Sequence, residues 1–225
     1  MRNLVISVMI AGGALALVGC AVPRASTMHY APAQFPNRIV NEAVVPESFD
    51  VCWSRLIAGL SSEFFVINNV EKASGLITLD FASEAPERYI DCGQTTRTYA
   101  DSTFTYAVAG DSQYLVDEKV GVNVARKEIH RTTSVEGKIN VHVSAVPDGT
   151  KIAVNVRYVL TTRVGGRYRI AGSLASGPVQ EFAPETYTKA FNTNAPSERE
   201  SQDDVSCGSN GALEQIILDV VRKKP

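Results

Sequence analysis

The sequence predicts an α+β fold in which an antiparallel sheet packs against an N-terminal and a C-terminal amphipathic helix. Apolar residues recur at helical spacing after Pro46 and again near the C-terminus, which predicts the two helices. Two long segments alternate apolar and polar residues on either side of a Pro-Asp-Gly turn, which predicts the sheet. We expect these elements to form a single domain over residues 46–225.

The first helix is predicted to begin after Pro46 and to end near Ser62. Ser48 is placed to cap its first turn, and Asp50 suits the positive end of the helix dipole. One face of this helix is apolar, which favours burial in a core over a role in binding. That face consists of Phe49, Cys52, Trp53, Leu56, Ile57 and Leu60.

Strands are predicted to follow the helix at 64–70 and 77–81, joined by a turn in which Gly75 permits a positive φ. Alternation predicts two more strands, at 103–108 and 119–124. We expect a loop over 109–113, and residues 84–102 show no regular period.

The clearest pattern predicts a hairpin. Ile139, Val141 and Val143 alternate with polar residues, and apolar residues alternate again over 152–160. The turn between them, 146–150, has the sequence Val-Pro-Asp-Gly-Thr. A second hairpin is expected to turn at Gly165-Gly166, because a glycine pair tolerates the tight turns of hairpins.

Residues 183–206 look mostly irregular and polar, and the closing helix follows them. Ser209 or Asn210 can cap its start, while the basic residues at its end suit the negative end of the helix dipole. Its apolar face needs a partner, and the inner face of the sheet is the expected one. That face consists of Leu213, Ile216, Ile217, Val220 and Val221.

Three cysteines lie in the expected domain. Cys52 falls on the apolar face of the first helix, which suits a buried free thiol. Cys92 and Cys207 each precede a glycine in a loop-like setting, so we expect a disulfide between them. A metal site is the competing interpretation, but no cysteine pair or histidine has ligand-like spacing.

The N-terminus resembles a bacterial lipoprotein signal. Arg2 is followed by a charge-free run that is too short to span a bilayer, and the run closes with Leu17-Val18-Gly19-Cys20. This ending is similar to the lipobox, Leu-x-Gly/Ala-Cys; the alternative is a plain secretory peptide with an incidental cysteine. The resemblance implies cleavage after residue 19 and acylation of Cys20, which would anchor the protein durably.

The same resemblance implies a location. Ala21, rather than Asp, follows the cysteine, which in similar proteins favours the outer membrane, so we expect a lipid-anchored protein facing the periplasm. Residues 20–45 contain Pro23, Pro32 and Pro36 and are expected to form a flexible, lipidated tether.

A second, fold-level resemblance concerns the order helix, strand, turn, strand and closing helix. It is similar to the helix-grip domains of the lipoprotein subunit of the barrel-assembly machinery. Trp53, Leu56 and Leu60 on the first helix and Gly75-Leu76-Ile77-Thr78 carry this resemblance. It implies a helix-grip-like arrangement but not a function.

The charge balance argues against a nucleic-acid partner. Removal of residues 1–19 takes away Arg2 and no acidic residue, which leaves 21 Lys and Arg against 24 Asp and Glu, a net charge of −3. Binding to nucleic acid depends on basic residues that neutralise phosphates, and no such excess exists here.

The sequence does not indicate a catalytic site. Gly110-Asp111-Ser112 matches the start of a GDS-type serine hydrolase signature, but it lies in mid-chain and no D-x-x-H exists, which favours a simple turn. The three histidines, His29, His130 and His142, lack the spacing of metal ligands. Because nucleotide-binding motifs are also missing, we expect a non-enzymatic protein with neither metal nor cofactor.

One basic cluster is a candidate contact for an anionic surface or an acidic partner. The competing interpretation is that these side chains decorate solvated sheet faces. The cluster consists of Arg157, Arg163, Arg167 and Arg169.

These observations predict a membrane-anchored lipoprotein that binds or scaffolds other envelope components, such as an envelope protein. The alternative is a carrier that holds a lipid or small ligand between helix and sheet. In that case Phe81, Val141 and Val154 would line the cavity.

Overall fold

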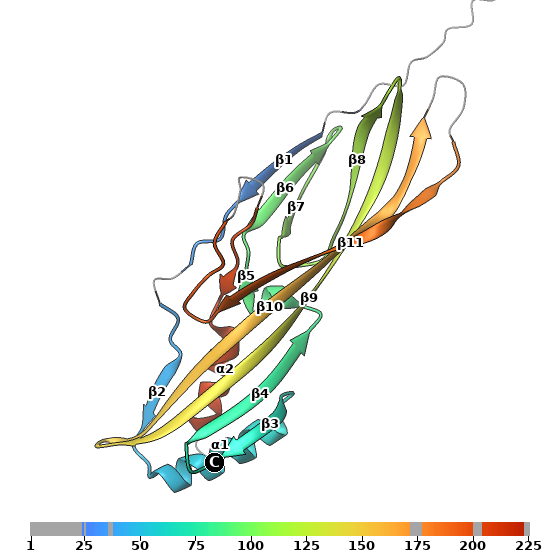
Figure 1. Cartoon of the computed structure of the whole chain (residues 1–225). Coiled ribbons are helices and arrows are strands. Elements are labelled where there is room, and N and C mark those ends of the chain that lie inside the picture. Colours follow the sequence, from blue (N-terminus) through green and yellow to red (C-terminus); the bar gives the residue numbers. More distant parts are fainter. Residues whose placement is uncertain (1–23, 25, 36–37, 172–176, 200–203, 223–225) are drawn as a thin grey trace, which may run out of the picture.

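The computed structural model describes residues 24, 26–35, 38–171, 177–199 and 204–222. In this part of the chain 59% of residues lie in strands and 15% in helices, and the strands form three antiparallel sheets. The expected α+β, helix-grip-like class is therefore wrong, and the fold is mainly β. A 14-residue helix spans about 21 Å whereas a 24-residue strand spans about 75 Å, so the helices cover only one end of the main sheet (Figure 1).

The main sheet is built on one long hairpin. β9 (Asn123–Val146) and β10 (Gly149–Ala171) pair along their whole lengths, with Val143 opposite Ile152. The predicted hairpin over 139–160 is thus confirmed, including its turn. Gly149 has φ +134°, and a Cβ there would lie 2.0 Å from the carbonyl oxygen of Val45, so the turn requires glycine.

The second hairpin, predicted at Gly165-Gly166, is wrong. β10 continues through both glycines, and Gly166 pairs with Ile129 on one side and Phe182 on the other. The register with β11 shifts between Val164 and Gly166, where two residues of β10 match three of β11, so the glycine pair lies opposite a bulge in the neighbouring strand. A Cβ on Gly166 would lie 2.0 Å from the carbonyl oxygen of Glu128, which explains the glycine by close backbone approach.

Shorter strands extend the sheet on both sides, in the order β11-β10-β9-β4-β3, with β2 also on β10 and β8 also on β9. The strand predicted at 77–81 is confirmed within β4, and the strand predicted at 64–70 overlaps β3. The sheet is completed by β2 (Glu42–Val45), β3 (Val66–Glu71), β4 (Leu76–Ser83), β8 (Ser112–Val120) and β11 (Gln180–Asn192).

Two other predictions for this sheet are wrong. The strand expected at 119–124 is interrupted by the β8–β9 turn, where Gly121 has φ +63°. The stretch 183–206, expected to be mostly irregular apart from a short periodic stretch around Tyr187 to Phe191, contributes most of β11. That strand lies at the edge of the sheet, so most of its side chains are exposed and it lacks the alternation of a half-buried strand.

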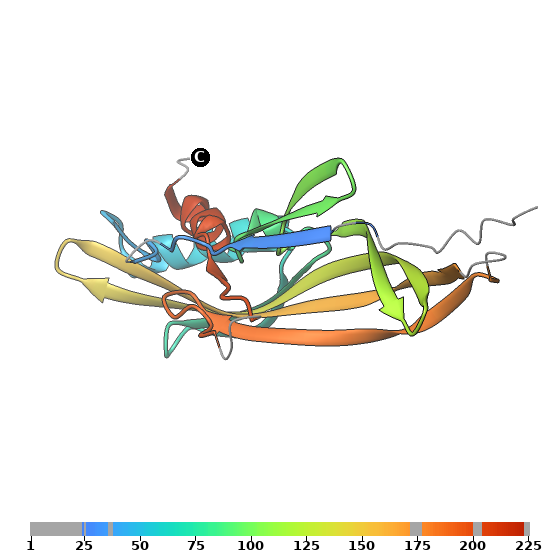
Figure 2. The same ribbon diagram turned by 90° about the horizontal axis from the view of Figure 1, so that it is seen from above.

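A three-stranded sheet, β1-β6-β7, lies over the other half of the long hairpin (Figures 1 and 2). It is formed by β1 (Ser26–Ala31), β6 (Gln94–Tyr99) and β7 (Ser102–Ala107), the last matching the strand predicted at 103–108. Residues 26–31 and 42–45, which we expected within a flexible tether, are therefore paired strands. Only five residues of the expected tether, 21–25, lie between Cys20 and the start of β1.

The two predicted helices are confirmed as α1 (Phe49–Ser62) and α2 (Ala212–Arg222). They pack on each other and on the end of the sheet near the β9–β10 turn (Figure 1). A Cβ on Gly59 would lie 2.2 Å from Cγ1 of Val220, so glycine permits this close helix contact. In the described part of the chain, no helix has the length and hydropathy needed to cross a membrane.

The predicted disulfide is confirmed. Cys92 and Cys207 are bonded and buried, and Cys52 is the buried free thiol that the helix face predicted. The bond closes one end of a small two-stranded sheet in which β5 (Ile90–Asp91) pairs with β12 (Gly208–Ser209). Cys92 directly follows β5, and Cys207 directly precedes β12. A 3-10 turn, η1 (Pro86–Arg88), comes before β5 in the chain. It therefore ties the segment before β6 to the segment before α2.

A buried polar cluster joins α2 to β10. The Ser209 hydroxyl lies 3.0 and 3.1 Å from the two carboxylate oxygens of Glu214 and 3.3 Å from the Tyr158 hydroxyl. Burial, together with the nearby Glu214, raises the pKa of Tyr158. These groups satisfy one another within the core, so the cluster is a structural link between helix and sheet.

Candidate functional site

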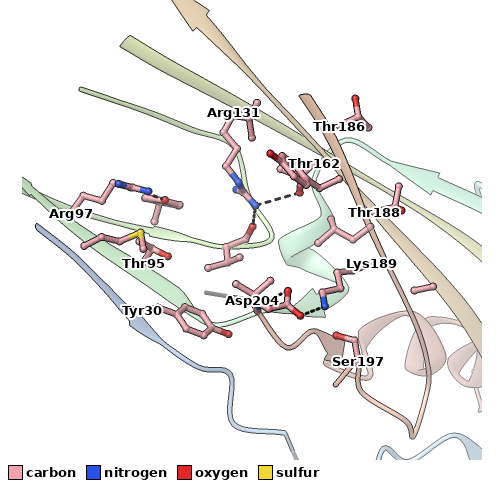
Figure 3. A pocket seen from close by; sticks show the side chains of 18 of the residues that line it. Tyr30, Thr95, Arg97, Arg131, Thr162, Thr186, Thr188, Lys189, Ser197 and Asp204 are labelled. Atoms are coloured by element: carbon pink, nitrogen blue, oxygen red, sulfur yellow. Dashed lines mark hydrogen bonds and ion pairs between the residues drawn. The ribbon is translucent and has the colours of Figure 1, made fainter. Parts of the chain in front are cut away.

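A half-open cleft of about 1,020 Å³ separates the three-stranded sheet from the inner face of the main sheet. Tyr30 and Thr95 lie on one side of it, and Thr162, Thr186 and Thr188 lie on the other (Figure 3). The inner faces of β9 and β10 form its floor beyond the end of the helices. The cleft thus exists because two sheets, rather than a helix and a sheet, face each other here.

Arg131 is the most enclosed cation in the cleft. Its Nη1 donates to the carbonyl oxygen of Gly110 at 2.6 Å, and its Nη2 donates to the carbonyl oxygen of Val108 and, at 3.5 Å, to the Thr162 hydroxyl. Burial lowers the pKa of this guanidinium. The Asp111 carboxylate is close enough to oppose this shift, but it accepts hydrogen bonds from the backbone and hydroxyl of Thr133. Among the described residues, the hydrogen-bond partners of Arg131 are all neutral.

Arg97, from β6, lies over an aromatic stack. Its guanidinium carbon is 3.9 Å from the ring centroid of Tyr114, and its Nε donates to the Tyr106 hydroxyl at 3.1 Å. The rings of Tyr106 and Tyr114 are nearly parallel, with centroids 6.0 Å apart. Within the described residues, neither terminal nitrogen of Arg97 has a hydrogen-bond partner, so its bidentate edge is available to a ligand.

The opposite end of the cleft is electrostatically balanced. Lys189, from β11, pairs with the Asp204 carboxylate, and its Nζ also contacts the carbonyl oxygen of Glu198. The Tyr30 hydroxyl donates to the carbonyl oxygen of Cys92 at 3.0 Å, so the disulfide segment borders the cleft. The two cations of the cleft that form no ion pair within the described residues, Arg97 and Arg131, lie at the other end.

This charge distribution makes the cleft chemically selective. In the described part of the chain, neither Arg97 nor Arg131 forms an ion pair. A guanidinium binds carboxylate or phosphate through paired, charge-assisted hydrogen bonds. The arrangement can therefore bind an anionic group, with hydroxyls from β10 and β11 available as further hydrogen-bond partners.

The predicted arginine cluster does not form one patch. All four side chains are exposed on the outer face of β10, but Arg157 lies near Lys138 in a separate hollow of about 520 Å³. Arg163 lies between the two ends of the cluster. Arg167 and Arg169 come together in a groove of about 700 Å³, and Arg167 pairs with Glu128 at 2.6 Å.

The remaining predicted site residues have separate outcomes. Cys20, with the whole signal segment 1–19, lies outside the described residues. Gly110 and Asp111 lie in the connection from β7 to β8, as the turn interpretation predicted, and Ser112 is the first residue of β8. Phe81, Val141 and Val154 belong to the hydrophobic core with at most 4% of each residue exposed, so the cavity that the carrier alternative required is not at that place.

Sequence reasoning missed Arg97 and Arg131 as a site. One signal was available for Arg131: the period-two pattern of Val141 and Ile139, continued backwards along β9, places residue 131 on the inner face. A charged residue on an otherwise inward-facing row is unusual and indicates a function or a partner. Arg97 had no comparable signal, because β6 is short and mostly polar, so no row of apolar residues marks one of its faces as the inner one.

Comparison with known proteins adds no assignment. No protein-family model, no curated protein and no solved structure matches this chain. The functional argument therefore depends on the geometry of the cleft and on the N-terminal motif.

Proposed function

We propose that this protein is a lipid-anchored, periplasm-facing binding component of the bacterial cell envelope, without enzymatic activity of its own. The inter-sheet cleft is its binding site and receives an anionic group of another envelope component. The observation that carries the proposal is the pair Arg97 and Arg131, two guanidinium groups inside one cleft with no carboxylate partner among the described residues.

The anchor supports the location. Leu17-Val18-Gly19-Cys20 closes a charge-free run, and Ala21 follows it. Two or three acyl chains on Cys20 would hold the protein at a bilayer, since a single chain binds only reversibly. A protein held in this way meets membrane-bound and periplasmic partners at high local concentration, which suits a binding or scaffold role.

The cleft is tested with a photo-crosslinking residue in place of Thr188, an exposed residue of its wall, in intact cells. Arg97→Gln removes the available charged edge and should reduce the crosslinked yield about tenfold or more, because a charge-assisted hydrogen bond is worth about 1.5–3 kcal/mol. The matched control is Arg163→Gln, which removes a charge from the outer face of β10 and should leave the yield unchanged. An equal yield in both variants would contradict the cleft as the binding site.

A further inference from the structure

The N-terminal end of the described chain is fixed at the end of the molecule that lies away from the helices. The backbone N–H of Arg24 donates to Oδ2 of Asp117 at 3.1 Å, and β1 begins two residues later. The Asp117 side chain is fully buried and also accepts hydrogen bonds from Tyr99 and Arg126, each at 2.9 Å. Cys20 precedes Arg24 by four residues, which span at most about 14 Å.

The β8–β9 turn lies at this same end (Figure 1). It exposes two apolar side chains: Val122 is 96% exposed and Val120 is 45% exposed. Turns of this kind are normally polar, and the turn needs only Gly121, whose φ is +63°, for its geometry. Two projecting valines within reach of an acylated cysteine are suited to the boundary between headgroups and acyl chains.

A basic groove lies beside the turn. Arg24, Arg126, Arg167 and Arg169 line this groove of about 700 Å³, together with apolar residues that include Leu115. Two of these arginines are compensated: Arg167 pairs with Glu128, which also lines the groove, and Arg126 pairs with the buried carboxylate of Asp117. Arg169 lies opposite Arg126 in the β9–β10 register and forms no ion pair within the described ranges. This charge complements the phosphate of lipid headgroups.

We propose that the β8–β9 turn and this groove are a second membrane contact, in which Val120 and Val122 enter the bilayer interface and Arg169 binds lipid phosphate. The inference rests on the proposed acylation of Cys20 and adds the orientation of the domain. A strand pair about 75 Å long then holds the helix end, with its filled core, away from the bilayer (Figure 2). The cleft lies between these two ends and stays accessible from the periplasm.

The test uses the full acylated protein, reconstituted into vesicles of phosphatidylethanolamine and phosphatidylglycerol. Val122→Cys is labelled with an environment-sensitive fluorophore, and the introduced thiol is the reactive one because Cys52 is buried and Cys92 is bonded to Cys207. Val51→Cys, an exposed position on α1, is the matched control. We expect the fluorescence at residue 122 to rise about twofold or more as the label leaves water, to be quenched by brominated lipids, and to remain unchanged at residue 51.

Three results would overturn the proposal, and they are distinguishable. If mass spectrometry shows an unmodified Cys20, the anchor and the second contact fail together. If the protein is acylated and sediments with the vesicles while the labels at 122 and 51 behave alike, the second contact fails and the anchor stands. If residue 122 is shielded in native envelopes but not in vesicles, the turn binds a protein instead of lipid.

The arginine contribution has its own measurement. Replacing anionic phosphatidylglycerol with phosphatidylcholine, whose phosphate is offset by a quaternary ammonium group, or introducing Arg169→Gln, should reduce the brominated-lipid quenching at residue 122. Equal quenching with both lipid mixtures and in the variant would remove the basic groove from the proposed contact.

Discussion

The two halves of the main sheet use the same strands for different purposes. On the inner face of β10, Val156 and Tyr158 are buried in the core, whereas Leu160, Thr162 and Val164, next on the same face, line the open cleft. The strand geometry does not change at this boundary. What changes is the element that lies over the inner face of the sheet. At one end two helices pack on this face through apolar side chains, and at the other end the three-stranded sheet faces it across the polar-lined cleft.

The same long strands therefore form both a packed core at one end and an open cleft at the other. The helix end excludes water, so its stability comes from apolar burial. The cleft end keeps two sheets apart, so Arg97 and Arg131 line a space that solvent or a ligand can enter. Substitutions at the two ends should therefore have opposite consequences, for stability at one and for binding at the other.

The disulfide gives the largest expected effect, because it ties segments that border both ends. Replacing Cys92 and Cys207 together by Ala should lower the free energy of unfolding by about 4 kcal/mol, since the bond closes a loop of more than one hundred residues in the unfolded chain. Urea unfolding measures the loss. A double variant as stable as the native protein would show that the bond constrains neither end.

A core substitution should give the next largest effect. Leu56 is fully buried on α1, and Leu56→Ala should lower the free energy of unfolding by about 3 kcal/mol because it leaves a cavity. Thr188→Ala, at the exposed wall of the cleft, is the matched control and should change it by less than about 0.5 kcal/mol. Similar losses from both substitutions would contradict the division into a packed end and an open end.

The smallest effect is expected at the start of β1, at the end of the molecule away from the helices. Burial alone would raise the pKa of Asp117, but hydrogen bonds from Arg126, the backbone of Arg24 and Tyr99 outweigh it and lower the pKa below the usual 3.8. A lowered pKa means that this carboxylate stabilises the fold above pH 3.8 and that the stabilisation is lost as the pH falls through the lower, folded-state value. Asp117→Asn should remove about 1–3 kcal/mol already at neutral pH.

Hydrogen exchange of the β1 amides measures this local effect. In the native protein, the protection of the backbone amides of residues 26–31 against hydrogen exchange should fall on acidification below pH 3.8. This comparison is made after correction for the change of intrinsic exchange rate with pH. In Asp117→Asn it should already be low at neutral pH, with amides at the helix end unaffected. Unchanged protection of β1 in the variant would show that Asp117 does not hold this strand in place.

Part of the fold was predictable because it depends on local periodicity. The face of α1 and the alternation of β9 and β10 around Pro147 each follow from the spacing of neighbouring residues. The disulfide was predictable because Cys52 lies on a helix face, which left the two loop cysteines as partners. In contrast, Gly165-Gly166 is compatible with either a turn or a strand irregularity, and local sequence does not distinguish them.

The sequence by itself determined the two helices, the central hairpin, the cysteine pair and the motif at Cys20. Only the tertiary structure decided that residues 26–31 pair with β6, that the strands outweigh the helices, and that Arg97 and Arg131 share one cleft. The physical reason is that a period of two specifies which side of a strand is apolar. It does not specify which distant strand lies beside it or what covers its face.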